Sequence, residues 1–273
     1  MNIIESRKFL GGRSFSFRDK ETGIELDNGQ HVITKACSMY LDLCERLDIL
    51  NRWQLQDDFH LRVYDRFKKI GTLKSSPLPA PFHLAPSFFT YGHLNFREKM
   101  GICAALYKAK RTNRDSHEFE RLLFVEWLVR NKQTPRSIEF FWNLLVMPIL
   151  NDRVEYVSTR MALMAIQEGL LKFRHNADIG YPVEPLSYMM AKWGVEYFAN
   201  QDSCLTLSTT VTGLTIRDGN VKAVELKDGT KLDSPILISA IPVDNLLKIL
   251  PRSSRSIPYF KRLEGLQNSP IVN

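Results

Sequence analysis

The sequence predicts a mixed α/β fold in which a largely helical segment is inserted between β-containing segments. Three observations predict it. Short extended stretches alternate with turns near the N-terminus. Apolar residues then recur at helical spacing through the middle of the chain, between residues 95 and 173. After residue 205 the apolar residues alternate with a period of two, and Asp-Gly pairs mark the turns.

The composition is that of an ordinary globular protein with a basic excess. The chain has 273 residues, of which 44% are hydrophobic and 25% charged, and its formal net charge is +7. A basic balance favours anionic partners, such as phosphates or acidic lipids, without choosing among them. No nucleic-acid-binding motif accompanies the charge, so no nucleic-acid partner is expected. We expect a cytoplasmic protein, with peripheral contact to the inner face of the cell membrane.

The cysteines and histidines do not form a recognisable metal or disulfide pattern. The four cysteines include no C-x-x-C pair, and the six histidines are scattered along the chain. We therefore expect reduced thiols and no metal site.

The first predicted element is a strand at residues 2–4, and Glu5 is a carboxylate at its end. Such an acid can accept hydrogen bonds from the ribose hydroxyls of an adenosine, or it can simply be solvated. The loop that follows carries Gly11, Gly12 and Arg13. Two glycines let the backbone approach a ligand and arginine can pair with a pyrophosphate, although a loop that only needs flexible residues would look the same.

Extended stretches at 14–17 and 24–26 follow, and a helix is predicted over 34–50. Asp27 or Asn28 can cap that helix. The alternative is functional: Gly29 allows close approach to a bound ring, and His31 can donate a hydrogen bond or a proton.

The middle of the chain begins with a hairpin at 59–73 and an irregular proline-rich connection at 75–89. Helices are predicted at 95–111, 119–130, 135–150 and 158–173. Basic and aromatic residues flank the first of them. They are Lys99, Lys108, Lys110, Arg111, Phe88, Phe89, Tyr91 and Phe96. This set predicts either contact with an anionic membrane surface or a packed helix with a charged outer face.

The last third predicts a three-stranded meander within 206–242, then a continuous apolar strand at 236–240 that would be buried on both faces. Ala240 and Pro242 end this strand, where ligands of open α/β sheets gather, or where proline simply starts a helix. A short helix is predicted at 243–250, and 269–273 begins another strand.

Several of these stretches together carry a family resemblance. I-I-E-S-R-x-x-L-G-G-R-S-x-S-F and E-L-D-N-G-Q-H-V resemble the flavin-dependent amine oxidase and phytoene desaturase superfamily, and more narrowly the bacterial hydroxysqualene dehydroxylases, the squalene-associated FAD-dependent desaturases. The same subgroup is matched at 78–84 (L-P-A-P-F-H-L), 141–146 (F-W-N-L-L-V), 177–187 (A-D-I-G-Y-P-V-E-P-L-S), 239–242 (S-A-I-P) and 269–273 (S-P-I-V-N).

The resemblance implies a partial Rossmann-like FAD domain with an inserted, largely helical substrate domain. The implied segments are 1–50 and 176–255 for FAD, 51–175 for substrate, and 256–273 for the start of a substrate-domain strand. FAD would then be held by Glu5 at the ribose, by Gly11, Gly12 and Arg13 along the pyrophosphate, and by Gly29 and Gln30 near the flavin. Val211 would meet the adenine, and Ala240 and Pro242 would complete the cofactor site.

The implied reaction is reductive loss of an allylic hydroxyl, which converts hydroxysqualene into squalene. The hydroxyl must leave as water, and His31 is the candidate proton donor. Carotenoid desaturation and amine oxidation are alternatives within the superfamily. A non-catalytic remnant, or a subunit completed by a second polypeptide, is the alternative outside it. The glycine-rich phosphate loop expected before Glu5 is absent, so we expect weak FAD binding and aggregation by this chain.

Overall fold

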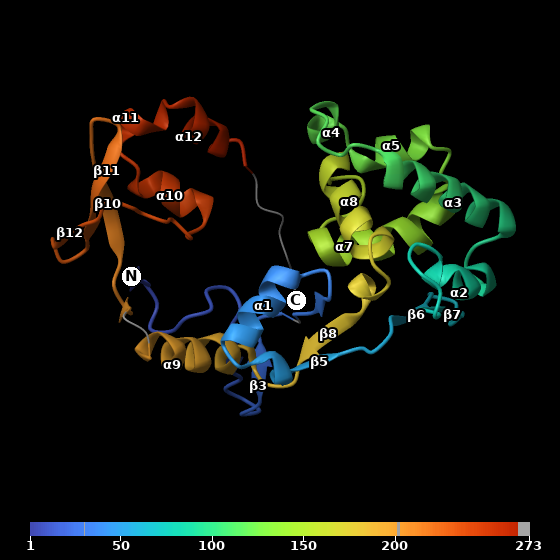
Figure 1. Cartoon of the computed structure of the whole chain (residues 1–273), viewed down its shortest axis with the longest axis horizontal. Helices are drawn as coiled ribbons and strands as arrows, with labels where there is room; N and C mark the ends of the chain where they lie inside the picture. Colours follow the sequence, from blue (N-terminus) through green and yellow to red (C-terminus); the bar gives the residue numbers. More distant parts are fainter. Residues whose placement is uncertain (30, 201–202, 267–273) are drawn as a thin grey trace. The chain divides into compact units, whose positions relative to one another are not determined.

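The computed structural model describes residues 1–29, 31–200 and 203–266 (Figure 1). The chain forms two compact units. One consists of residues 1–29 and 184–273, and the other of residues 30–183. Strands and helices occur in both units, so the predicted mixed α/β class is confirmed.

The described residues of the discontinuous unit form three small sheets. Strand β1 (Asn2–Ile4) pairs in parallel with β9 (Cys204–Thr206), and β2 (Ser16–Arg18) pairs antiparallel with β3 (Glu25–Asp27). The predicted meander is confirmed as β10 (Val211–Arg217), β11 (Asn220–Leu226) and β12 (Lys231–Asp233). Asp218 and Gly219 have positive φ angles of 53° and 73°, as the tight turn between β10 and β11 requires.

The described helical segments of this unit are η6 (Tyr188–Lys192), α9 (Trp193–Ala199), α10 (Val243–Ile249), α11 (Arg252–Arg255) and α12 (Pro258–Leu263). Helix α10 packs on β10 of the meander, whereas α9 packs on β9. Leu214, Val224, Leu226 and Leu250 form the buried cluster, and Ile4 and Val211 pack against it. This shared cluster fixes the end of β1 beside the start of β10.

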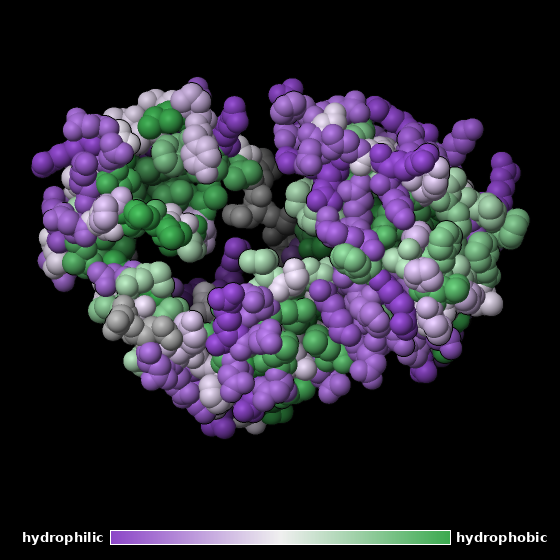
Figure 2. All heavy atoms as spheres, in the orientation of Figure 1, coloured by the Kyte–Doolittle hydropathy of each residue, from purple (hydrophilic) through white to green (hydrophobic). Residues whose placement is uncertain are grey.

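The prediction of a buried strand at residues 236–240 is wrong. The chain after β12 forms no strand and pairs with none in the described part of the unit. Ile236 and Ile238 are 75% and 81% exposed. An apolar sequence favours a buried strand only where a neighbouring backbone offers hydrogen bonds, and none runs alongside this segment. Figure 2 shows hydrophobic residues at the surface in the region that β10–β12 and α10 occupy in Figure 1.

In its described residues, the second unit contains two sheets. In the first, β8 (Ile179–Pro182) lies between β4 (Ile33–Thr34) and β5 (Trp53–Leu55) and is antiparallel to both. The predicted hairpin is confirmed as β6 (His60–Tyr64) and β7 (Ile70–Lys74). In the part of the chain that the structure describes, no helix is long and apolar enough to cross a membrane.

Helices make up the rest of this unit. They are α1 (Ser38–Arg46), η1 (Leu50–Arg52), η2 (Phe82–Leu84), α2 (Ala85–Thr90), α3 (Phe96–Arg111), α4 (Glu118–Arg121), α5 (Phe124–Arg130), α6 (Pro135–Ser137), η3 (Ile138–Trp142), α7 (Asn143–Leu150), α8 (Thr159–Ile166), η4 (Gln167–Leu171) and η5 (Arg174–Ala177). A capping box between Asn95 and Glu98 starts α3 where the sequence predicted a helix. The aromatic centre of the core is Trp142, which contacts Phe124 and Phe141 edge-on.

Two local predictions in this unit are corrected. The segment 75–89 is not wholly irregular, because helix α2 begins inside it with a proline in its first turn, where no amide donor is needed. The single helix predicted at 119–130 is divided into α4 and α5. Leu123 separates them in extended conformation and forms a β-bridge with Ser158.

The basic and aromatic set around α3 does not form one surface. Phe88, Tyr91 and Lys99 are buried, with exposures of 6%, 1% and 7%. Lys99 Nζ donates to the carbonyl of Phe89 at 2.7 Å, and burial, together with the nearby Lys69, lowers its pKa. The packed-helix alternative therefore holds for these three residues, whereas Lys108, Lys110 and Arg111 are exposed.

Candidate functional site

Glu5 lies where β1 ends and is held by the neighbouring parallel strand. Its amide donates to the carbonyl of Thr206 at 2.9 Å, and its carbonyl accepts from the amide of Thr209 at 3.0 Å. Carboxylate oxygen Oε1 accepts from the Arg7 amide at 2.7 Å and from Ser6 Oγ at 3.1 Å. Oxygen Oε2 has no partner among the described residues, so one oxygen is free to accept from a ligand hydroxyl.

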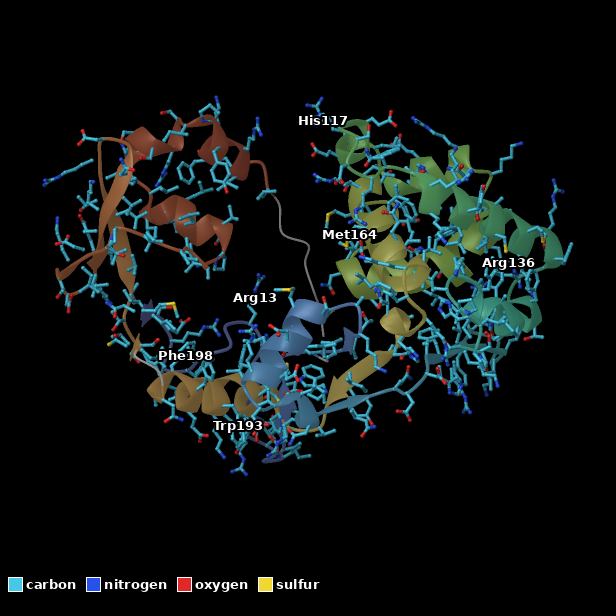
Figure 3. The ribbon with its side chains drawn as sticks, viewed as in Figure 1. Arg13, His117, Arg136, Met164, Trp193 and Phe198 are labelled. Atoms are coloured by element: carbon cyan, nitrogen blue, oxygen red, sulfur yellow. The ribbon has the colours of Figure 1, made fainter. Side chains whose placement is uncertain are left out.

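The glycine loop offers hydrogen-bond donors. Gly11 and Gly12 have φ angles of 105° and 57°, which side chains rarely allow, and a Cβ at Gly12 would meet nothing within 4 Å. Among the described residues, the amides of Gly11, Gly12 and Arg13 donate to no acceptor. The Arg13 side chain, labelled in Figure 3, is exposed. Consecutive free amides beside a guanidinium suit a phosphate group.

Arg7 holds this loop in place, and the sequence analysis missed it. Its NH1 donates to the carbonyl of Gly12 at 2.8 Å. Its guanidinium carbon lies 5.6 Å from the ring centroid of Phe9 and 5.5 Å from that of Phe15. The sequence spacing could have indicated this bond. Arg7 comes two residues after the acid that ends the strand and five residues before Gly12, so its long side chain can reach across the loop.

Asn28 connects the glycine loop to the end of β3. Its Nδ2 donates to the carbonyl of Arg13 at 3.2 Å, and its amide donates to the carbonyl of Phe15 at 2.8 Å. Gly29 follows with a φ of 83°. Glu5, Arg7, Gly12, Arg13 and Asn28 are therefore linked, through bonds and adjacent residues, into one path that ends at Gly29.

Asp27 does not cap a helix, which corrects one alternative. Its Oδ1 accepts from Ser16 Oγ at 2.7 Å and from the amide of Leu186 at 3.1 Å, so it ties β2 and β3 to a distant segment of the same unit. Gln30 lies outside the described residues. His31 belongs to the second unit, where it precedes β4, and its candidate role stays a prediction.

Val211 lies close to Glu5 along the backbone. The hydrogen bond from the Thr209 amide to the Glu5 carbonyl lies two residues before β10, which begins at Val211. The neighbouring residue Ile4 and Val211 also pack on the same apolar cluster. Ala240 lies in the exposed segment after β12. The carbonyl of Pro242 accepts from the amides of Asn245 and Leu246, as in a simple turn into α10.

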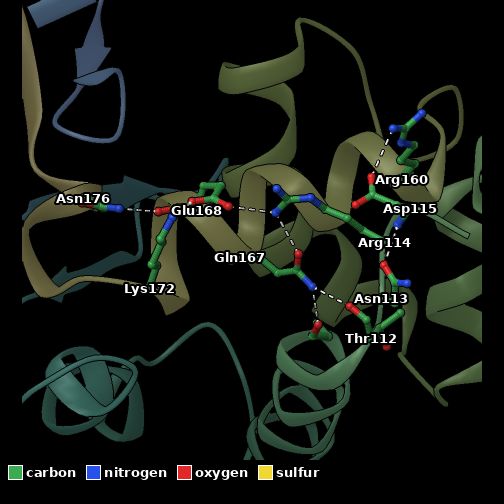
Figure 4. Close-up of polar contacts among 10 residues, drawn as sticks. Thr112, Asn113, Arg114, Asp115, Arg160, Gln167, Glu168, Lys172 and Asn176 are labelled. Atoms are coloured by element: carbon green, nitrogen blue, oxygen red, sulfur yellow. Dashed lines mark hydrogen bonds and ion pairs between the residues drawn. The ribbon is translucent and has the colours of Figure 1, made fainter. Parts of the chain in front are cut away.

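The second unit contains an extended polar network where α3 ends (Figure 4). Arg114 NH1 donates to Gln167 Oε1 and Glu168 Oε1, both at 2.9 Å, and Lys172 Nζ donates to Glu168 Oε2 at 2.7 Å. Gln167 Nε2 donates to the carbonyls of Ala109 and Thr112 at 2.8 and 2.9 Å. Bonds from Lys172 and Arg114 lower the pKa of Glu168. The network therefore joins η4 to the end of α3 and the residues that follow it.

The site residues of the discontinuous unit suit the nucleotide half of a dinucleotide cofactor. A free carboxylate oxygen accepts from hydroxyls, and free amides with an arginine receive an anion. These are two recognition elements that adenosine and pyrophosphate need, and the Arg7 and Asn28 bonds hold them on one loop path.

Comparison with known proteins agrees with this reading. The profile of the family described as flavin containing amine oxidoreductase matches residues 1–273. The 15-cis-phytoene desaturase of Solanum lycopersicum is 24% identical over 282 residues, covering 99% of this chain and 47% of the relative. The 15-cis-phytoene desaturase of Synechococcus elongatus is also 24% identical, over 287 residues, covering 99% of this chain and 59% of the relative. The chain thus spans about half the length of the curated relatives it matches.

A solved structure shows the same fold. An oxidoreductase from Methanosarcina mazei superposes with a TM-score of 0.66 at 17% identity, covering 97% of this chain and 60% of that one. The family implies a flavin cofactor, which agrees with the nucleotide-suited loop of the discontinuous unit. The family profile spans the whole sequence, and the chain therefore belongs to the flavin containing amine oxidoreductase family.

Proposed function

We propose that the protein is an FAD-dependent oxidoreductase that acts on a long isoprenoid, and that it reductively removes the hydroxyl of hydroxysqualene to give squalene. The observation that carries the nucleotide part is the linked path from Glu5 to Gly29 with its free amides. The substrate part rests on the resemblance of separate sequence stretches to the hydroxysqualene dehydroxylases.

Each site residue has a proposed task. Glu5 Oε2 accepts from the ribose hydroxyls, and the amides of Gly11, Gly12 and Arg13 with the Arg13 guanidinium receive the pyrophosphate. The backbone of Val211 meets the adenine. Gly29 is proposed to lie near the flavin, and Ala240 and Pro242 to complete the cofactor site.

The proposed reaction needs two electrons and a proton donor. When bound, the reduced flavin supplies a hydride. The substrate's carbon–oxygen bond breaks, the hydroxyl takes a proton and leaves as water, and the carbon receives the hydride. His31 is proposed to hold the proton that the leaving hydroxyl takes. Peripheral membrane contact and pairing with a second polypeptide stay predictions.

Carotenoid desaturation is the second candidate, because the relatives named above are phytoene desaturases. The two candidates move electrons in opposite directions. Dehydroxylation consumes reduced flavin, whereas desaturation takes hydrogen from the substrate and reduces oxidised flavin.

An anaerobic experiment with the flavin-loaded protein separates them. Hydroxysqualene is added to the reduced protein and phytoene to the oxidised protein, while flavin absorbance and the products' masses are followed. Our proposal expects flavin oxidation coupled to squalene formation in the first mixture, and slower oxidation in His31→Asn. Flavin reduction by phytoene, with no reaction of hydroxysqualene, would replace it with desaturation.

A further inference from the structure

Helix α3 has two apolar faces, and the core of the helical unit covers only one of them. Ile102, Ala105 and Ala109 are 0%, 2% and 0% exposed and belong to the hydrophobic core. Phe96 and Tyr107, in contrast, are 71% and 61% exposed. The core contacts that hold α3 in place therefore leave large apolar side chains uncovered.

These uncovered residues form a continuous stripe. Phe96, Met100, Ala104 and Tyr107 are all exposed, and each comes three or four positions after the one before it. That spacing places them above one another on a helix. We call these four residues the apolar stripe, which runs about 17 Å along the helix axis. Figure 2 shows hydrophobic residues at the surface, beside hydrophilic ones, in the region that α3 occupies in Figure 1.

Basic side chains border the apolar stripe on both sides. Arg97 and Lys108 each come one position after a stripe residue, so they lie along one border. Lys110 comes three positions after Tyr107 and lies along the other border. Arg111 ends the helix, and its guanidinium carbon lies 4.9 Å from the ring centroid of Tyr107. All four basic residues are exposed.

No acidic side chain offsets these charges on the exposed face of α3. The acidic residue of the helix is Glu98, which is buried and forms the capping box with Asn95. Among the described residues, Arg97, Lys108 and Lys110 form no ion pair. The face therefore combines an apolar centre with positive charges that have no partner within the described chain.

This combination discriminates among partners. A second copy of the same face would bring like charges together, which costs free energy. A lipid surface with anionic headgroups supplies negative charge and hydrocarbon together along the whole length of a helix. It therefore complements both the stripe and its two borders.

We propose that α3 docks on an anionic lipid surface, with the apolar stripe among the upper acyl chains and the basic borders on the headgroups. The set predicted from the sequence for membrane contact included Phe88, Tyr91 and Lys99, which are buried and take no part in this face. The docking does not depend on the proposed reaction, and its test contains neither flavin nor isoprenoid.

The test is flotation of the full chain with vesicles of phosphatidylglycerol and phosphatidylcholine, and with vesicles of phosphatidylcholine alone. One variant changes the stripe, Phe96→Gln/Tyr107→Gln, and the other changes a border, Lys108→Gln/Lys110→Gln. Glutamine keeps the helix propensity of these exposed positions. An acidic amphipathic peptide, with a leucine stripe between glutamates, is titrated in parallel to represent a protein partner.

Each variant has a matched control. Tyr156→Gln/Phe173→Gln removes two aromatic residues of the same unit that are 72% and 60% exposed and lie outside α3. Lys222→Gln/Lys227→Gln removes two exposed lysines from β11 and the turn that follows it, so it matches the change in net charge.

We expect the chain to float with the anionic vesicles, less so as salt is raised, and weakly with phosphatidylcholine alone. The border variant should bind about 30-fold more weakly, or about fivefold for each lysine. The stripe variant should bind at least about tenfold more weakly. Both controls should bind as wild type does.

A second measurement on the wild-type chain locates the contact without any substitution. Lysine acetylation is mapped by mass spectrometry with and without anionic vesicles. Lys108 and Lys110 should become protected, whereas Lys222 and Lys227 should react as before.

Several results would overturn the proposal. Absence of flotation, or flotation that survives in both α3 variants, would exclude this face as the docking surface. Binding that only the border variant weakens would mean adsorption by charge alone. Unchanged acetylation of Lys108 and Lys110 on vesicles would place the contact elsewhere, and binding of the acidic peptide without flotation would replace the lipid surface with a protein partner.

Discussion

Replacing Arg7 with alanine is expected to disorder the glycine loop without unfolding the protein. The substitution removes the bond from NH1 to the Gly12 carbonyl at 2.8 Å and the contacts of the guanidinium with the rings of Phe9 and Phe15. A hydrogen bond from a charged group contributes about 1.5–3 kcal/mol, and an exposed cation–π contact about 0.5–1 kcal/mol. Because Arg7 is exposed, we take the lower values, which give about 2 kcal/mol of loop order.

That free energy appears in cofactor affinity because the loop must be ordered to present its amides. A loss of about 2 kcal/mol weakens binding about 30-fold. The first assay is flavin titration, in which Arg7→Ala raises the Kd by that factor. The second needs no cofactor: amide hydrogen exchange at Gly11, Gly12 and Arg13 speeds up, while the Tm changes by less than about 2 °C.

Arg18→Ala is the matched control, since Arg18 is an exposed arginine of β2 whose side chain makes no hydrogen bond among the described residues. It should leave exchange in the loop and flavin affinity unchanged. Unaltered exchange and affinity in Arg7→Ala would refute the reasoning. A large fall in Tm would equally refute it, because Arg7 would then support the whole unit rather than the loop.

Further predictions concern the helical unit. Trp142→Ala should destabilise it by about 3–5 kcal/mol and lower its Tm by about 10 °C, because the buried ring and its hydrogen bond to Gln133 at 2.9 Å are lost. A Tm within about 3 °C of wild type would contradict this packing. Gly180→Ala should destabilise the unit by about 1–3 kcal/mol, because a Cβ there would overlap Leu55 and approach Ile33 Cγ1 at 3.1 Å. Gly101→Ala is the control: it lies on α3, a Cβ there would be 3.7 Å from its nearest neighbour, and the substitution should raise the Tm. Equal effects of the two substitutions in urea melts would argue against the sheet register. The pKa of Glu168 is lower in the folded protein than in the unfolded chain, where it is about 4.3. Its carboxylate therefore contributes its full stabilisation above the unfolded pKa, and this stabilisation is lost as the pH falls through the folded pKa. The Tm difference between wild type and Glu168→Gln should therefore shrink on acidification, and a difference that stays constant from pH 7 to pH 3 would exclude this linkage.

Local chemistry made the meander and helix α3 predictable. Asp-Gly pairs favour tight hairpin turns whatever surrounds them, and both lie where β10, β11 and β12 are joined. Asn95 and Glu98 are three residues apart, as a capping box requires, so the start of α3 depends on neighbours in the sequence. Glu5 and the glycine loop were proposed as site residues from local pattern in the same way, and their role stays a prediction.

Pairing between distant residues was not predictable from these patterns. The residues 236–240 are apolar enough for a buried strand, yet burial needs a partner strand that the local sequence does not specify. The sheet β4-β8-β5 was missed because β8 finds its partners well over a hundred residues away.

The sequence by itself therefore determined the mixed α/β class, the hairpin turns and the capped helix, because each depends on interactions within a few residues. Only the tertiary structure decided that Lys35 meets Asp178, 143 residues away. A contact between residues far apart in the sequence requires a long loop to be closed, and only the packing of the whole core offsets the entropy lost in closing it.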